Sequence, residues 1–65
     1  MPPNKLTIQS DGNTLELLRT IKTKTGTDYE YQFTKSETKL GMTMTMSEEH
    51  LTKNLKNKIF INEGA

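Results

Sequence analysis

The fold is decided by one stretch in the last third of the chain, residues 39–59, which reads KLGMTMTMSEEHLTKNLKNKI. Apolar and polar residues alternate up to Met46, and this period of two is typical of a strand with methionines on one face and threonines on the other. At Ser47 the spacing becomes helical, and its hydroxyl can accept a hydrogen bond from a free amide of the first helical turn. One apolar stripe then follows at intervals of four residues: Leu51, Leu55 and Ile59. The stretch predicts a strand that runs directly into one terminal helix.

The chain is short, and its length bounds the size of its core. We expect residues 1–65 to form one domain, with loose ends at 1–4 and 62–65. A domain of this size buries only about 60% of its unfolded surface and is marginally stable alone. Cysteine is absent, so neither a disulfide nor a thiolate metal site can stabilise it. Oligomerisation or a partner remains as a source of stability, and we therefore expect a homodimer.

Charge and composition exclude several classes of protein. Nine basic and eight acidic residues give a net charge of +1, which neither indicates nor excludes a nucleic-acid partner. No apolar run reaches membrane-spanning length, and the N-terminus lacks the apolar core of a signal peptide. We therefore expect an intracellular protein, in the cytoplasm or nucleoid of its own cell or of an infected host cell. His50 has no second histidine or cysteine to complete a metal site, and there is no nucleophile–base spacing or phosphate-binding glycine loop. We expect no enzyme, no cofactor, no metal and no membrane contact.

Turn-forming residues place three hairpin tips, at residues 11–12, 24–26 and 36–39. Asp-Gly suits a two-residue loop at the first tip, and Gly26 suits the left-handed position of a three-residue loop at the second. Each tip sets the register of the two strands that it joins, and the three registers agree, because together they gather one apolar face. That face comprises Leu6, Ile8, Leu15, Leu17, Ile21, Tyr29, Tyr31, Phe33, Leu40, Met42, Met44 and Met46.

The registers make specific pairings. The first hairpin sets Leu6 opposite Leu17. The second and third hairpins set Ile21 and Met46 opposite Tyr29, one on either side. The leucines of the second strand also fit helical spacing, but the threonine- and lysine-rich run that follows them is poor helix material and favours a strand. The sequence thus predicts an α+β fold, a four-stranded antiparallel meander sheet followed by one C-terminal helix.

Three segments carry a resemblance to a known family: KLGMTMTMSEEHL at residues 39–51, YEYQFT at residues 29–34, and Gly26 at the second hairpin. Over about residues 6–59 the chain resembles the positive-cofactor-four family of transcriptional coactivators and its bacterial and viral relatives. Gln32 holds the position where that family has a basic residue in its third strand. The resemblance implies a dimer joined through the helices, here by the stripe Leu51, Leu55 and Ile59. It also implies curved sheets that bind single-stranded DNA with little sequence dependence, in transcription, replication or recombination.

Candidate DNA-binding residues flank the two long hairpin tips. Lysines there could contact phosphates, and Tyr31 or Phe33 could stack on bases. Each has an alternative role, since lysines also guard sheet edges and aromatic rings also fill cores. Arg19 could stack on Tyr31 or reach a phosphate. The candidate set is Arg19, Lys22, Lys24, Tyr31, Gln32, Phe33, Lys35 and Lys39.

A protein from another class fits the same pattern. A small protein-binding inhibitor or adaptor would use the threonine-rich outer face of the sheet, or an edge strand, against its partner. Salt distinguishes the two interpretations, because phosphate contacts by lysines weaken with salt and threonine contacts do not.

Overall fold

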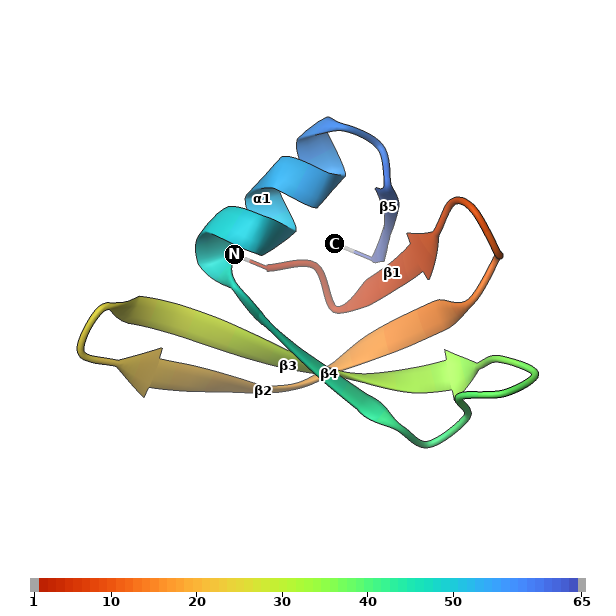
Figure 1. Cartoon of the computed structure of the whole chain (residues 1–65), viewed down its shortest axis with the longest axis horizontal. Helices are drawn as coiled ribbons and strands as arrows, with labels where there is room; N and C mark the ends of the chain where they lie inside the picture. The colour runs from red at the N-terminus through yellow and green to blue at the C-terminus, as the bar shows by residue number, and fades with distance from the viewer. Residues whose placement is uncertain (1, 65) are drawn as a thin grey trace.

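The computed structural model describes residues 2–64 as a five-stranded antiparallel sheet and one helix (Figure 1). The elements in chain order are β1 (Lys5–Ile8), β2 (Thr14–Thr23), β3 (Gly26–Lys35), β4 (Thr43–Ser47), α1 (Glu48–Lys56) and β5 (Phe60–Gly64). The strand order across the sheet is β4-β3-β2-β1-β5, so β4 and β5 form its two edges. The α+β class is confirmed, but the arrangement of four strands and a terminal helix is wrong, because a fifth strand follows the helix and pairs with β1.

The end of the helix explains the fifth strand. Asn57 caps α1 by donating its backbone amide to Lys53, and Lys58 then adopts a positive φ of 60° that turns the chain back. Phe60 thereby enters the core and is 5% exposed, whereas Ile59 lies outside the helix and is 47% exposed. The predicted stripe therefore ends at Leu55, and the placement of Ile59 on it is wrong.

The two ends of the chain are also more ordered in the structure than the sequence predicts. Residues 62–64 lie in β5 and pair with β1, and Pro3 is buried. The expectation of loose ends is wrong for these residues, and residues 1 and 65 lie outside the described part of the chain.

The core lies between one face of the sheet and α1 (Figure 1). Most of the predicted apolar face belongs to it or packs against it, but Leu40 and Met42 are 67% and 57% exposed. They precede the first residue of β4 in a loop that turns at Gly41, which has a φ of 84°. The buried residues are Leu6, Leu15, Tyr29, Tyr31, Phe33, Met46, Leu51 and Phe60.

Two of the three registers carry informative differences. The β3–β4 register is confirmed, with Tyr29 opposite Met46. In the first hairpin Leu6 lies opposite Leu15 rather than Leu17, a shift of two residues that leaves every side chain on its predicted face. The cause is a longer loop, in which the Ile8 amide donates to the Asn13 carbonyl.

The β2–β3 hairpin differs more, because β2 contains a bulge. Its register shifts between Leu17 and Arg19, so the outer half of β2 presents the opposite face. The tip also differs from the prediction, because Thr23 pairs with Gly26 and the loop has two residues, Lys24 and Thr25, instead of three. Ile21 consequently lies opposite Asp28 and not opposite Tyr29. The prediction of a strand for this segment is confirmed, but the inward placement of Ile21 is wrong.

Candidate functional site

The four candidate lysines lie at two opposite ends of the sheet. Lys22 and Lys24 belong to the β2–β3 tip, whereas Lys35 and Lys39 lie at the other end of β3, beside the β3–β4 loop (Figure 1). Successive tips of a meander alternate between the ends of its strands, and the molecule is 35 Å long. One chain therefore does not gather these lysines into a single cluster.

The lysine side chains are nevertheless available. Within residues 2–64, Arg19 and Glu30 form the only ion pair, and Lys22 and Lys24 are both exposed. They lie on a two-stranded ribbon that extends away from the helix (Figure 1). A phosphate could approach these two amino groups without first displacing a carboxylate.

Arg19 does not stack on Tyr31 in the structure. The bulge in β2 sets it opposite Glu30 rather than Tyr31, and its Nε donates to the Glu30 carboxylate. Its side chain remains 67% exposed, but the neighbouring carboxylate compensates its charge. Arg19 is thus a weaker phosphate ligand than the tip lysines.

The aromatic side chains lie inside the protein. Tyr31 is fully buried and its hydroxyl donates to the Pro3 carbonyl at 2.8 Å. Phe33 is 5% exposed, and the Lys39 ammonium lies 5.5 Å from the centre of its ring. Tyr29 and Phe60, the remaining aromatic residues, are buried as well. No ring face is therefore open for a base to stack on, and the stacking role expected of Tyr31 or Phe33 has no surface.

Burial also governs the ionisation of the tyrosines. Burial, followed by repulsion from a charged Tyr29, raises the pKa of Tyr31 to about 12. The pKa of Tyr29 is raised by burial, by the negative charge of Glu48 and by a hydrogen bond to that carboxylate. Both phenol groups therefore keep their protons at neutral pH.

Gln32 holds the β3–β4 loop in place. Its side-chain amide donates to the Gly41 carbonyl at 3.3 Å, so this residue supports the loop instead of presenting a free donor. The loop exposes Leu40 and Met42 near Lys39, an apolar surface that the alternating pattern assigns to the core. Gly41 is the signal that could have shown it, because a glycine with positive φ interrupts a strand.

The helix stripe expected to form a dimer contact is used within the protomer. Leu51 is 3% exposed in the core and Leu55 packs against it. Phe60 of β5 belongs to the same buried core. Leu51 therefore has no surface left for a dimer contact, and Leu55 is only partly exposed on α1.

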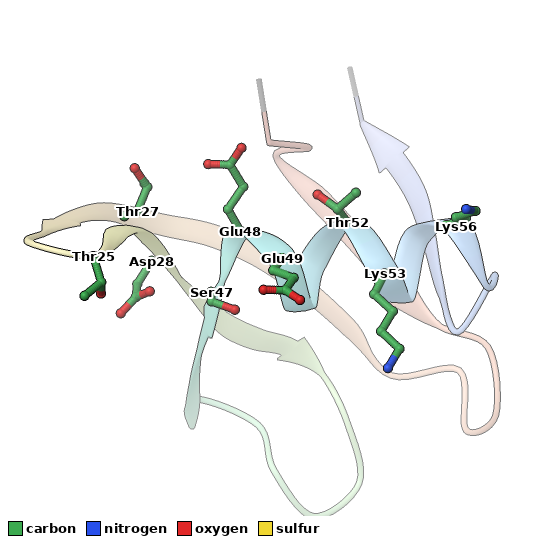
Figure 2. Close-up of a pocket in the computed structure, with 10 residues that line it drawn as sticks. Thr25, Thr27, Asp28, Ser47, Glu48, Glu49, Thr52, Lys53 and Lys56 are labelled. Carbon is green, nitrogen blue, oxygen red and sulfur yellow. The ribbon is translucent and has the colours of Figure 1, made fainter.

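An open groove of about 700 Å³ separates the helix from the β2–β3 tip (Figure 2). Figure 2 shows acidic side chains between the hairpin and the first helical turn, and two lysines farther along the helix. The acidic groups are Asp28, Glu48 and Glu49, and the lysines are Lys53 and Lys56. Three carboxylates at one end make this groove a poor site for a phosphate backbone. In the described part of the chain, no set of histidine and acidic side chains is placed to hold a metal ion.

Comparison with protein-family models, curated proteins and solved structures finds no match to this chain. None of the helical structure in residues 2–64 is long and apolar enough to cross a bilayer.

Proposed function

We propose that this protein binds single-stranded DNA through the tip of its β2–β3 hairpin, with little dependence on base sequence. The observation that carries the proposal is the pair of exposed lysines, Lys22 and Lys24, without a carboxylate partner. Each phosphate that a lysine neutralises releases counterions, which supplies sequence-independent affinity. The order of β1–β4 and α1, although not the strand β5 that follows, resembles the positive-cofactor-four family and supports the same class of ligand.

The preference for single strands needs a source other than aromatic stacking. Leu40 and Met42 are exposed beside Lys39 and offer apolar surface to unpaired bases. This surface lies at the end of β3 opposite the Lys22–Lys24 tip, so a single strand would have to run along the sheet to contact both. Bases in a duplex are stacked on one another and cannot use such surface. The expected preference over duplex is accordingly smaller than the 1–3 kcal/mol per base, roughly, that aromatic stacking supplies.

The test is fluorescence anisotropy with labelled single-stranded and duplex oligonucleotides across a salt series. Replacing Lys22 and Lys24 together by alanine should weaken single-strand binding and reduce the salt slope by about 1.4, at about 0.7 for each phosphate that is no longer neutralised. The matched control replaces Lys53 and Lys56, which removes the same charge from the groove beside the helix. It should change the slope little.

Two outcomes would contradict this assignment. Equal decreases in affinity for both double variants would show that net charge alone matters and that the tip is not the site. Absence of any oligonucleotide binding at low salt would contradict the proposed DNA-binding function itself.

A second candidate is a small protein-binding inhibitor or adaptor. The observation that favours it is the neutral, exposed outer surface of β4, Thr43 and Thr45, which is continuous with exposed Leu40 and Met42. Binding of this kind would resist salt and would be abolished by Leu40→Lys rather than by the tip-lysine variant. The salt series therefore separates the two functions.

A further inference from the structure

The strand β4 has an unguarded edge. It pairs with β3 on one side, and no strand in residues 2–64 pairs with its other side. Its sequence, TMTMS, contains neither a charged residue nor a proline. Proteins usually protect edge strands with such residues, because a free row of backbone donors and acceptors recruits another strand.

The backbone bonds of β3 identify which groups of β4 are free. Phe33 directs both its amide and its carbonyl toward β4, bonding to Met42 and Gly41. Successive residues of a strand point their backbone groups to opposite sides, so Met44 and Met46 bond to β3. The amides and carbonyls of Thr43 and Thr45 must then point to the open edge.

We propose that β4 pairs with β4 of a second copy of this chain, antiparallel and centred on Thr45. In this register Thr45 lies opposite Thr45, and Thr43 lies opposite Ser47 of the other copy. It is the antiparallel register that pairs all five residues of the strand and joins the outward-facing groups on both sides. The two sheets become one continuous sheet around a two-fold axis, with the same surface used by both copies.

Charge complementarity favours a second copy as the occupant. The proposed register carries Met42 and Gly41 of one copy alongside Glu48 and Glu49 of the other, just beyond the paired strands. The Met42 amide donates to the Lys39 carbonyl, so a tight turn returns Lys39 toward Met42 and brings a basic residue near the acidic first turn of the other copy's helix. The two-fold axis repeats the arrangement. Within the strand, neutral threonines and methionines oppose each other and no like charges meet.

The pairing goes beyond the proposed function and does not depend on it. It uses neither Lys22 nor Lys24, which belong to β2 and its tip, two strands from the open edge of β4. It also replaces the helix-mediated dimer, whose apolar stripe lies within the protomer.

A cysteine at Thr45 tests the register directly, because the chain has no cysteine of its own. Directly opposed hydrogen-bonded residues have Cα atoms about 5.5 Å apart, within disulfide range. Thr45→Cys should therefore form a covalent dimer on mild oxidation. The control is Thr43→Cys, whose copies would lie about 14 Å apart, four residues along the strand, and should not cross-link. Equal cross-linking of both variants, or of neither, would overturn the register.

A second pair of variants tests the interface by sedimentation. Thr45→Pro removes an outward amide without removing a bond to β3, and edge strands tolerate such a proline. It should be monomeric at concentrations tenfold above those at which wild type dimerises, with an unchanged circular dichroism spectrum. Thr45→Val retains the amide and should dimerise like wild type.

Sedimentation also distinguishes this inference from the proposed function. A monomeric wild type at high concentration, or a dimeric Thr45→Pro, would overturn the pairing whatever the DNA-binding result. The Lys22 and Lys24 double variant should remain a dimer even if it no longer binds DNA. If Thr45→Pro fails to fold, the cysteine pair still decides.

Discussion

Tyr31 combines a ring that fills the core with a hydroxyl that needs a polar partner. Its ring is fully buried, and its hydroxyl satisfies the carbonyl of Pro3 near the start of the chain. Burial of both groups is stabilising only while the bond between them is made, since a buried unpaired carbonyl or hydroxyl costs about 1–3 kcal/mol. This single hydrogen bond ties the N-terminal segment to the central strand.

The raised pKa of Tyr31 makes stability depend on alkaline pH. The folded protein keeps the phenolic proton up to a pKa of about 12, whereas an ordinary tyrosine loses it at 10.0. The stabilising contribution is thus complete below pH 10.0 and is lost as pH rises toward about 12. We expect the free energy of unfolding, measured in urea, to fall by up to about 1.4 kcal/mol per pH unit in this window.

The control for this prediction is Tyr31→Phe, which has no phenolic proton at that position. It should show a shallower decline, and the remainder should come from Tyr29, whose pKa is also raised. An unchanged slope in the variant would show that Tyr31 does not titrate differently in the folded and unfolded states.

At the scale of elements, the junction of β4 and α1 turns the chain from strand to helix within one residue. Ser47 ends the strand with an extended backbone, and its hydroxyl accepts a hydrogen bond from the His50 amide at 3.1 Å. Glu48 and Glu49 follow in the first turn, where the helix dipole favours negative charge. Because α1 has only nine residues, its stability depends strongly on such interactions at its ends.

Removing this cap should destabilise the whole domain. We expect Ser47→Ala to lower the free energy of unfolding by about 1 kcal/mol, or roughly 4–8 °C in melting temperature. Ser47→Thr keeps the acceptor and should stay close to wild type. All variants are compared at one protein concentration, because dimerisation would change the apparent stability. An unaltered alanine variant would mean that the cap does not support the helix.

At the scale of the whole molecule, β5 closes the core that the helix alone leaves open. The strand pairs with β1 and inserts Phe60 beside the helix and the sheet. The domain thus buries most of its apolar face within one chain. The edge strand β4 is the surface that we propose for dimerisation. The sheet and α1 enclose this small core and Phe60 of β5 helps to fill it, which explains how a chain without cysteine becomes compact.

Two neighbouring residues test this closure. Phe60→Ala should cost about 3–5 kcal/mol and leave the domain largely unfolded, since small domains have little stability to lose. Ile59→Ala should change stability by less than about 0.5 kcal/mol, because that side chain is 47% exposed. Urea or thermal unfolding distinguishes these outcomes. The opposite ranking would restore the longer helix stripe that the sequence predicts.

Of the candidate site, only the exposure of the lysines was predictable from the sequence. Exposure of the lysines follows from composition and turn positions, and the structure agrees for Lys22 and Lys24. The sequence left open whether Tyr31 and Phe33 are buried. Alternation assigns both residues to one face of the sheet but does not show which element covers that face. The separation of the two lysine pairs depends on the meander, which sends successive tips to opposite ends.

The sequence by itself determined the features that depend on near neighbours: the strand identity of residues 14–23, the β3–β4 register, and the start of the helix at Ser47. Alternation, turn residues and a capping hydroxyl act over a few neighbouring positions, so they can be recognised in a single sequence. Only the tertiary structure decided the fifth strand, the bulge before Arg19 and the exposure of Leu40 and Met42. Each of these depends on packing between segments distant in sequence, where the free energy of filling one shared core overrides local preference.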